Sequence, residues 1–310
     1  MLISPPFGGG RAPVLARNTV ASSQPLATQA GIEVLQNGGN AVDAALATAI
    51  TLTVVEPTMN GLGGDGFAIL WDGKKLHGLN ASGRAPAAWK PEYFAGKSAM
   101  DLIGWNTVTV PGMVAGWIDL SRKFGKLPFA QLFKRAIDYA ENGFPVSPVI
   151  ARQWREAIPI LKNQPGFSES FLIDGKSPQA GQIWKYPAQA KTLKEIAATE
   201  GESFYKGPLA QSMVDFAQAT GGCFTMQDFA DNQSEWVEPL AFDYGDYTLH
   251  EIPPNGSGIA AQIALGILQA ANVKQYPANS AQRIHLQIEA MRMAFADVYA
   301  YVSDARSMQM

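Results

Sequence analysis

The feature that most constrains this chain is a glycine-rich turn at residues 61–66, Gly-Leu-Gly-Gly-Asp-Gly. The letters match the G-x-G-x-x-G pattern of dinucleotide-binding turns, which follow a strand and open a helix. Here the order is reversed, because residues 41–55 have helical spacing and the apolar run 67–71 indicates a buried central strand. We therefore expect no nucleotide at this turn. Its glycines are expected to permit positive φ or close backbone approach, and a turn that lines a pocket built by other segments stays an alternative.

The remaining elements alternate between helices and short hairpins. Asp72-Gly73 predicts a hairpin that returns over residues 74–80, and Tyr244 to Tyr247 form the tip of a second hairpin over residues 242–252. Helical spacing covers residues 23–37, 41–55, 112–125, 129–142, 187–200, 207–220, 259–271 and 280–301. We see no flexible linker, so we expect one domain over residues 1–310, of α/β or α+β class.

The charge balance, and the number and spacing of the cysteine and histidine residues, exclude several classes of function. The chain carries 24 Lys and Arg against 27 Asp and Glu, so no strong field attracts nucleic acid or an anionic membrane. Its single cysteine, Cys223, excludes an internal disulfide and a cysteine-based metal cluster. His77, His250 and His285 are far apart, share no ligand spacing and have no serine elbow. The sequence therefore predicts no metal, no cofactor and no Ser-His-Asp set.

The N-terminus and the most apolar run of the chain indicate where in the cell the protein is located. Prolines at positions 5 and 6 and glycines at 8–10 interrupt any secretory leader, and residues 44–55 are too short to cross a bilayer. We therefore expect a cytoplasmic protein without a membrane partner.

One arginine is a candidate substrate contact. Arg84 follows the second strand of the first predicted hairpin among the small residues Ala81, Ser82 and Gly83. A guanidinium there could hold a carboxylate through two parallel hydrogen bonds. A surface arginine or an internal ion pair stays an open alternative. Glu289 and Arg292, at i and i+3 on one predicted helix, are interpreted as a surface pair.

Seven segments, in order along the chain, resemble the γ-glutamyltranspeptidase family. They are residues 38–45 (GGNAVDAA), 56–67 (EPTMNGLGGDGF), 110–116 (VPGMVAG), 140–147 (AENGFPVS), 224–229 with 236–239 (FTMQDF, WVEP), 251–258 (EIPPNGSG) and 289–297 (EAMRMAFAD). The resemblance implies an N-terminal-nucleophile (Ntn) hydrolase with an αββα sandwich, made as a self-cleaving precursor. The new N-terminal threonine would form an acyl-enzyme with a γ-glutamyl or related amide, resolved by water or an amine.

Two departures from the family pattern define the expected site. The family's threonine lies beyond the segment matched by residues 289–297, so the resemblance implies a large-subunit region without catalytic residues, with its own small subunit as partner. The family's carboxylate-binding arginine aligns with Ser82, and Arg84 lies two positions later. Since a shift of two keeps the same face of a strand, Arg84 could partly substitute, and Ser82 and Arg84 are the predicted substrate-binding residues. A preference for other acyl groups, as in the related cephalosporin and glutaryl acylases, is the alternative that the resemblance leaves open. A catalytically silent fragment or pseudoenzyme, acting only in binding or assembly, is the alternative.

Overall fold

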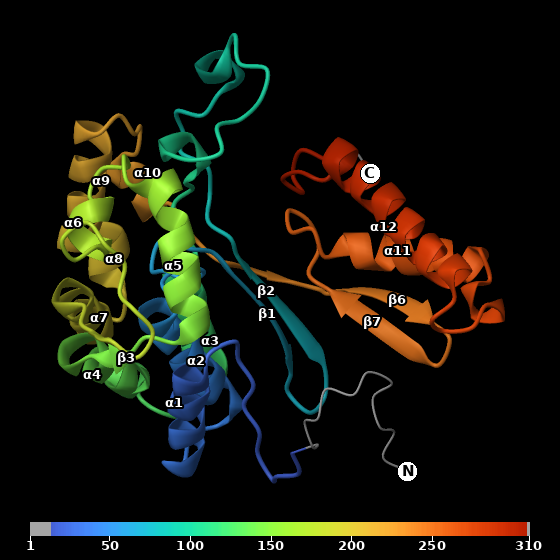
Figure 1. Ribbon diagram of the computed structural model, residues 1–310, viewed down its shortest axis with the longest axis horizontal. Helices are drawn as coiled ribbons and strands as arrows, with labels where there is room; N and C mark the ends of the chain where they lie inside the picture. Colours follow the sequence, from blue (N-terminus) through green and yellow to red (C-terminus); the bar gives the residue numbers. More distant parts are fainter. Residues whose placement is uncertain (1–13, 309–310) are drawn as a thin grey trace. The chain divides into compact units, whose positions relative to one another are not determined.

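The computed structural model describes residues 14–308, which divide into two compact units (Figure 1). Among the described residues, one unit comprises the chain up to Asn60 together with Ser121–Ala198, and the other comprises Gly61–Leu120 together with the chain from Thr199 onward. Helices and short strands are mixed along the chain, so the predicted α/β or α+β class is confirmed.

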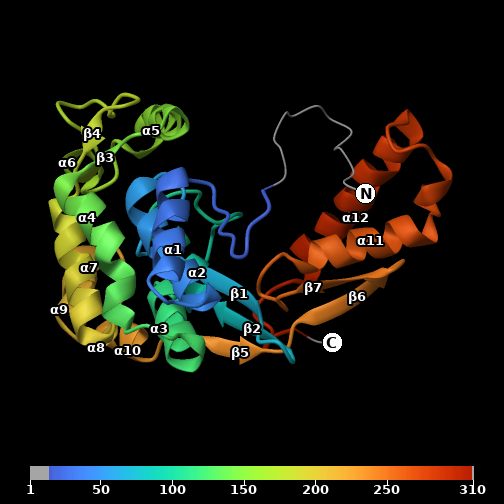
Figure 2. The same ribbon diagram turned by 90° about the horizontal axis from the view of Figure 1, so that it is seen from below.

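The first unit is mostly helical. Its helices are α1 (Pro25–Gln36), α2 (Ala41–Val55), α4 (Lys134–Asn142), α5 (Pro148–Leu161), α6 (Phe167–Phe171) and most of α7 (Pro187–Thr199). Helix α1 packs on α2, and α2 packs on α4 (Figures 1 and 2). A two-residue strand pair, β3 (Phe144–Pro145) with β4 (Ile183–Trp184), completes it.

Helix α2 begins at a capping box that also fixes a distant turn. Asn40 accepts a hydrogen bond from the Asp43 amide, and Asp43 accepts one from the Asn40 amide at 2.9 Å. The carboxylate of Asp43 is fully buried and also accepts from the amides of Lys126 and Leu127. One side chain therefore satisfies unpaired backbone donors on two segments.

The second unit contains a three-stranded antiparallel sheet in the order β1-β2-β5: β1 (Gly66–Trp71), β2 (Leu76–Ala81) and β5 (Glu235–Val237). Short helices α8 (Glu202–Lys206), α9 (Pro208–Ala219) and α10 (Met226–Ala230) follow one another in sequence. The predicted second hairpin is β6 (Leu240–Tyr244) with β7 (Tyr247–Glu251). Helix α11 (Ile259–Ala270) packs on this hairpin and on α12 (Ala281–Tyr301), where Ala264, Ala290 and Ala294 form part of a buried cluster.

Strand β1 differs from the prediction of a buried central strand. It lies at the edge of its sheet, and Phe67, Ile69 and Trp71 are 43%, 41% and 60% exposed. Successive side chains alternate between the two faces of a strand, so one face of an unbroken apolar run stays open unless a second layer covers it. The apolar composition alone therefore predicted more burial than these residues have.

The glycine turn is a helix-to-strand connection, as predicted, but positive φ is not its reason. None of Gly61, Gly63, Gly64 and Gly66 has a positive φ. The turn instead supplies a hydrogen-bond acceptor. The Gly64 carbonyl accepts hydrogen bonds from the amides of Gly112 and Met113 at 3.2 Å each. These amides start helix α3 (Met113–Phe124), whose first donors would otherwise lack partners.

Candidate functional site

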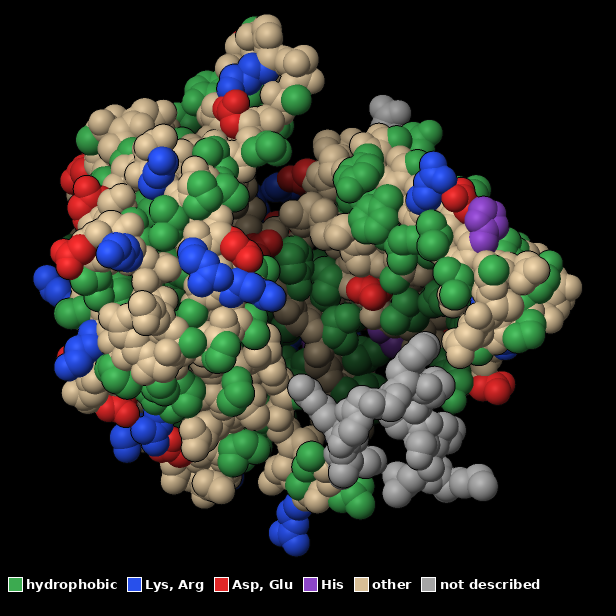
Figure 3. Space-filling view, viewed as in Figure 1, with side chains coloured by type: hydrophobic (Ala, Val, Ile, Leu, Met, Phe, Trp, Pro, Cys, Tyr) green, Lys and Arg blue, Asp and Glu red, His purple; other side chains and the backbone are tan. Residues whose placement is uncertain are grey.

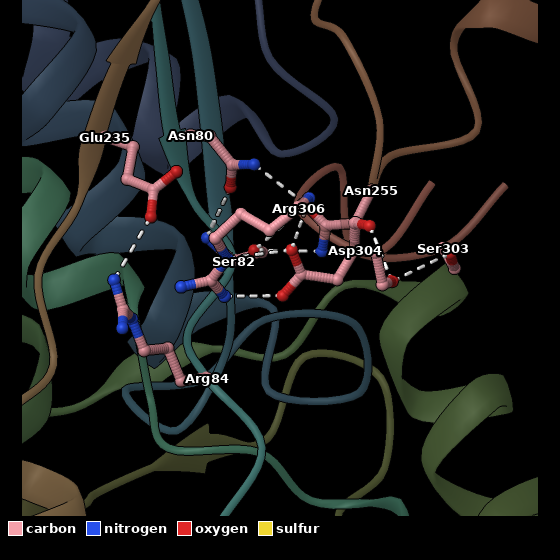
Figure 4. A network of polar contacts seen from close by, with 9 residues as sticks. Asn80, Ser82, Arg84, Glu235, Asn255, Ser303, Asp304 and Arg306 are labelled. Carbon is pink, nitrogen blue, oxygen red and sulfur yellow. Dashed lines mark hydrogen bonds and ion pairs between the residues drawn. The ribbon is translucent and has the colours of Figure 1, made fainter. Parts of the chain in front are cut away.

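A polar pocket of about 480 Å³ lies within the second unit, at the C-terminal end of β2. Five segments line it: Asn80 with residues 82–85, Thr109, Gln233 with Glu235, Pro254 with Asn255, and residues 304–306. Both predicted substrate-binding residues, Ser82 and Arg84, are among the lining residues. The segments are far apart in the sequence, and side-chain hydrogen bonds join Asn80 and Ser82 to Asn255 and Arg84 to Glu235 (Figure 4).

A close backbone crossing positions Ser82 and Arg84. Gly83 has a φ of +80°, and a Cβ there would lie 1.8 Å from the Val110 carbonyl oxygen. The Val110 amide donates to the Arg84 carbonyl at 2.9 Å, so the two segments are also hydrogen-bonded. Gly112 lies at the same crossing, where an added Cβ would lie 2.3 Å from the Ala81 carbonyl oxygen. Only glycine fits at these contacts, and the crossing fixes the backbone that carries both side chains.

Ser82 belongs to an amide network. The Ser82 amide donates to Asn80 Oδ1 at 3.0 Å, Asn80 Nδ2 donates to Asn255 Oδ1 at 2.8 Å, and Asn255 Nδ2 donates to Ser82 Oγ at 3.1 Å (Figure 4). No histidine, lysine or carboxylate is a hydrogen-bond partner of Ser82 Oγ in the described part of the chain. The hydroxyl is thus arranged to bind a polar group, with no base to activate it as a nucleophile.

Arg84 is paired inside the pocket. Its Nη2 donates to Glu235 Oε1 of β5 at 3.2 Å, and the two side chains are 42% and 51% exposed. The internal ion pair left open by the sequence is therefore present. The contact uses one of the guanidinium's five N–H groups, so donors remain for a second carboxylate.

Asp304 and Arg306 complete the pocket, and the sequence analysis did not find them. Arg306 donates through Nε to Asp304 Oδ1 at 2.9 Å and through its backbone amide at 3.0 Å. The hydrogen bonds from Arg306 lower the pKa of Asp304 to about 2. Two guanidinium groups, two carboxylates and three side-chain amides thus surround one cavity, a set suited to a ligand with a carboxylate and further polar atoms.

Other candidates from the sequence lie outside the pocket. Glu289 and Arg292 form the expected pair on α12, with Arg292 Nη1 2.7 Å from Glu289 Oε1. His77 contacts Asp72 Oδ2 at 2.8 Å on the first hairpin. Across residues 14–308, no group of three or more His, Cys, Asp or Glu side chains is placed to hold a metal ion, and no helix combines the length and hydropathy of a membrane span.

The comparisons with known proteins concern the family of the chain as a whole. The family model for gamma-glutamyltranspeptidase matches residues 27–310. The glutathione hydrolase-like YwrD proenzyme of Bacillus subtilis is 36% identical over 93% of this chain and 55% of its own length. The oxamate amidohydrolase proenzyme of Klebsiella pneumoniae is 36% identical over 91% of this chain and 54% of its own. The chain thus spans about half the length of these curated relatives.

A solved structure matches the whole fold. The cephalosporin acylase of Bacillus halodurans aligns with a TM-score of 0.87 and 41% identity, covering 98% of this chain and 60% of that one. The Ntn-hydrolase large-subunit fold that the sequence resemblance implied is thereby confirmed. The ordered motifs, the fold and the matches over nearly the full length lead to one conclusion: this chain belongs to the gamma-glutamyltranspeptidase family.

Proposed function

We propose that this chain is the large-subunit part of a precursor of a γ-glutamyltransferase-like amidohydrolase. The nucleophile would be an N-terminal threonine of a small subunit, released by self-cleavage beyond residue 310. Support comes from relatives named as proenzymes, of which the chain spans about half, and from Ser82 Oγ having no base partner.

In the proposed reaction the threonine hydroxyl passes its proton to the threonine's own amine and attacks the amide carbonyl of the substrate. The amide C–N bond breaks, and the leaving amine takes up the proton. Water or an acceptor amine then attacks the acyl-enzyme ester and frees the threonine. The pocket at the end of β2 would hold the far end of the acyl group and so leave the chemistry to the small subunit.

The observation that carries the proposed substrate class is the composition of the pocket. Arg84 would hold a carboxylate of a γ-glutamyl or related acyl group, and Ser82 and Asn255 would hold its polar atoms. The Glu235 carboxylate already offsets part of the positive charge of Arg84, so a substrate carboxylate must compete with Glu235. We therefore expect modest γ-glutamyl recognition, weak transfer to amines and a preference for hydrolysis.

Intact mass spectrometry of the product of the complete reading frame tests the proposal. We expect two polypeptides whose masses sum to that of the precursor plus one water, with turnover of γ-glutamyl-p-nitroanilide or a related acyl anilide. The 310-residue chain alone should neither cleave itself nor release the anilide. A complete product that stays one chain and turns over no acyl anilide would instead support the catalytically silent binding module, and turnover by the pure 310-residue chain would contradict the assignment of the nucleophile.

A further inference from the structure

A second cavity, unrelated to the pocket at β2, lies within the first unit. It measures about 490 Å³ and is bounded by α5 and the turn over residues 173–180. Arg152 and Arg155 of α5 and Lys176 of the turn line it, together with the buried Pro178. In Figure 3, Lys and Arg side chains lie over α5, with an acidic side chain beside them.

Both elements that carry these cations are held firmly. Trp154, buried on α5 between the two arginines in sequence, donates from its indole N–H to the Phe171 carbonyl at 2.9 Å. The turn is closed by two hydrogen bonds of 2.9 Å between Ile173 and Lys176, with Asp174 and Gly175 at φ values of 50° and 72°. These are the positive φ values of a two-residue hairpin turn. The backbone positions of the three cations are therefore set before any ligand binds.

Ion pairs distinguish these three cations from others of the same unit. In the same unit Arg135 pairs with Glu33 and Lys194 pairs with Glu141. Arg152, Arg155 and Lys176 form no ion pair within the part of the chain that the structure describes, and no acidic residue lines their cavity. Asp174 and Glu156, their neighbours in sequence, are not among the lining residues. Positively charged side chains around a concave surface raise the local concentration of anions.

We propose that this cavity binds a small organic polyanion, with at least two phosphate or carboxylate groups on a compact body. Two arginines can each bind an oxyanion bidentately, and the lysine adds a third contact from the opposite element. Ser177 and Gln179 add polar groups at the rim, whereas Ala151, Ile158 and Pro178 supply apolar contact for the carbon body. The volume suits a small molecule. The site is separate from the acyl pocket and does not depend on the proposed reaction.

Isothermal titration calorimetry of the 310-residue chain tests this site, with inorganic pyrophosphate and citrate as the phosphate and carboxylate probes. We expect saturable binding of at least one probe at one molecule per chain, weakening as salt is added. The double variant Arg152→Gln/Arg155→Gln should weaken it at least tenfold. The matched control, Lys134→Gln/Lys191→Gln, removes two exposed charges of the same unit outside the cavity and should change the affinity less than twofold.

The pattern of results decides the proposal. Preference for one probe identifies the anionic group that the site takes. Absence of saturable binding for both probes at millimolar concentration contradicts the site. Equal weakening by the two double variants also contradicts it, because the attraction would then come from the net charge of the unit. Circular dichroism of each variant shows whether the fold is retained, and all four substituted side chains are exposed.

Discussion

At the residue scale, the carboxylate of Asp43 joins the start of α2 to the turn at residues 125–127. It is fully buried and accepts hydrogen bonds from the amides of Asn40, Lys126 and Leu127. Asp43→Asn keeps the shape but points an NH₂ group at backbone donors, so we expect a loss of roughly 1.5–3 kcal/mol in the free energy of unfolding.

Urea denaturation measures that loss, and hydrogen exchange at the amides of Lys126 and Leu127 locates it. Both amides should exchange faster in the variant. Asp174→Asn is the control, because Asp174 is exposed and its positive φ suits asparagine. Equal stability of the two variants would show that the buried hydrogen bonds of Asp43 contribute little.

The pair of Asp304 and Arg306 gives a prediction about pH. Hydrogen bonds from Arg306 lower the pKa of Asp304 from 3.8 to about 2. A folded-state pKa below the unfolded value stabilises the fold above the unfolded pKa, so this contribution is present above pH 4 and is lost as the pH falls from about 4 to 2. Both side chains are at least half exposed, so the contribution is small.

NMR titration of the Asp304 carboxyl carbon checks this shift directly. We expect a midpoint near 2 in the unaltered chain, moving towards 3.8 in Arg306→Gln and staying in place in Arg292→Gln. A midpoint near 3.8 without any substitution would show that the pair does not persist in solution.

Only part of the pocket at the end of β2 could be predicted from the amino-acid sequence. Arg84 and Ser82 follow a strand among small residues, and the motif alignment indicates their positions. Their partners could not be predicted, because Glu235 and Asn255 lie more than 150 positions away and nothing local marks the pairing. Arg306 follows the last helix in a segment without periodicity or motif. Contacts of this kind depend on the tertiary fold alone.

At the element scale, the crossing of β2 and the segment before α3 depends on glycine. Gly112 has no positive φ, but its Cβ would lie 2.3 Å from the Ala81 carbonyl oxygen and 2.4 Å from the Gly83 nitrogen. Gly112→Ala must push the two segments apart, so we expect a loss of about 1–3 kcal/mol. Gly61→Ala is the matched control, since nothing lies within 4 Å of its Cβ position.

Urea denaturation of the two variants of the 310-residue chain measures the free energy of unfolding that each substitution removes. The Gly112 variant should unfold at lower urea, and the Gly61 variant should resemble the unaltered chain. If both unfold at the same urea concentration, the crossing tolerates a methyl group and does not fix the position of Ser82 and Arg84.

Long periodic elements were predictable, and short or interrupted ones were not. Helices α2 and α12 lie where the apolar spacing places them. Helix α5 was missed because Pro148 starts it and Pro159 lies inside it, which hides the helical signal. Strands β3 and β4 have two residues each, too few to show alternation.

At the scale of the whole molecule, the order of the motifs identified the family, whereas the two compact units were not visible in the sequence. The chain passes between the units at residues 60/61, 120/121 and 198/199, and the last two points fall inside α3 and α7. A boundary inside a helix has no Pro- or Gly-rich linker to mark it. The edge strand β1, with Phe67, Ile69 and Trp71 exposed, is consistent with the proposed small-subunit partner.

The most direct test of the central claim is kcat/KM of Arg84→Ala in the complete enzyme, with paired acyl anilides that carry or lack a carboxylate on the acyl group. A charge-assisted bidentate contact contributes about 1.5–3 kcal/mol, so we expect a fall of about tenfold or more on the carboxylate-bearing substrate, mainly through KM. The neutral substrate should be unaffected, and Arg292→Ala should leave both unchanged. If Arg84→Ala leaves kcat/KM unchanged on every carboxylate-bearing donor, Arg84 serves only its ion pair with Glu235, and the pocket at β2 does not recognise the acyl group.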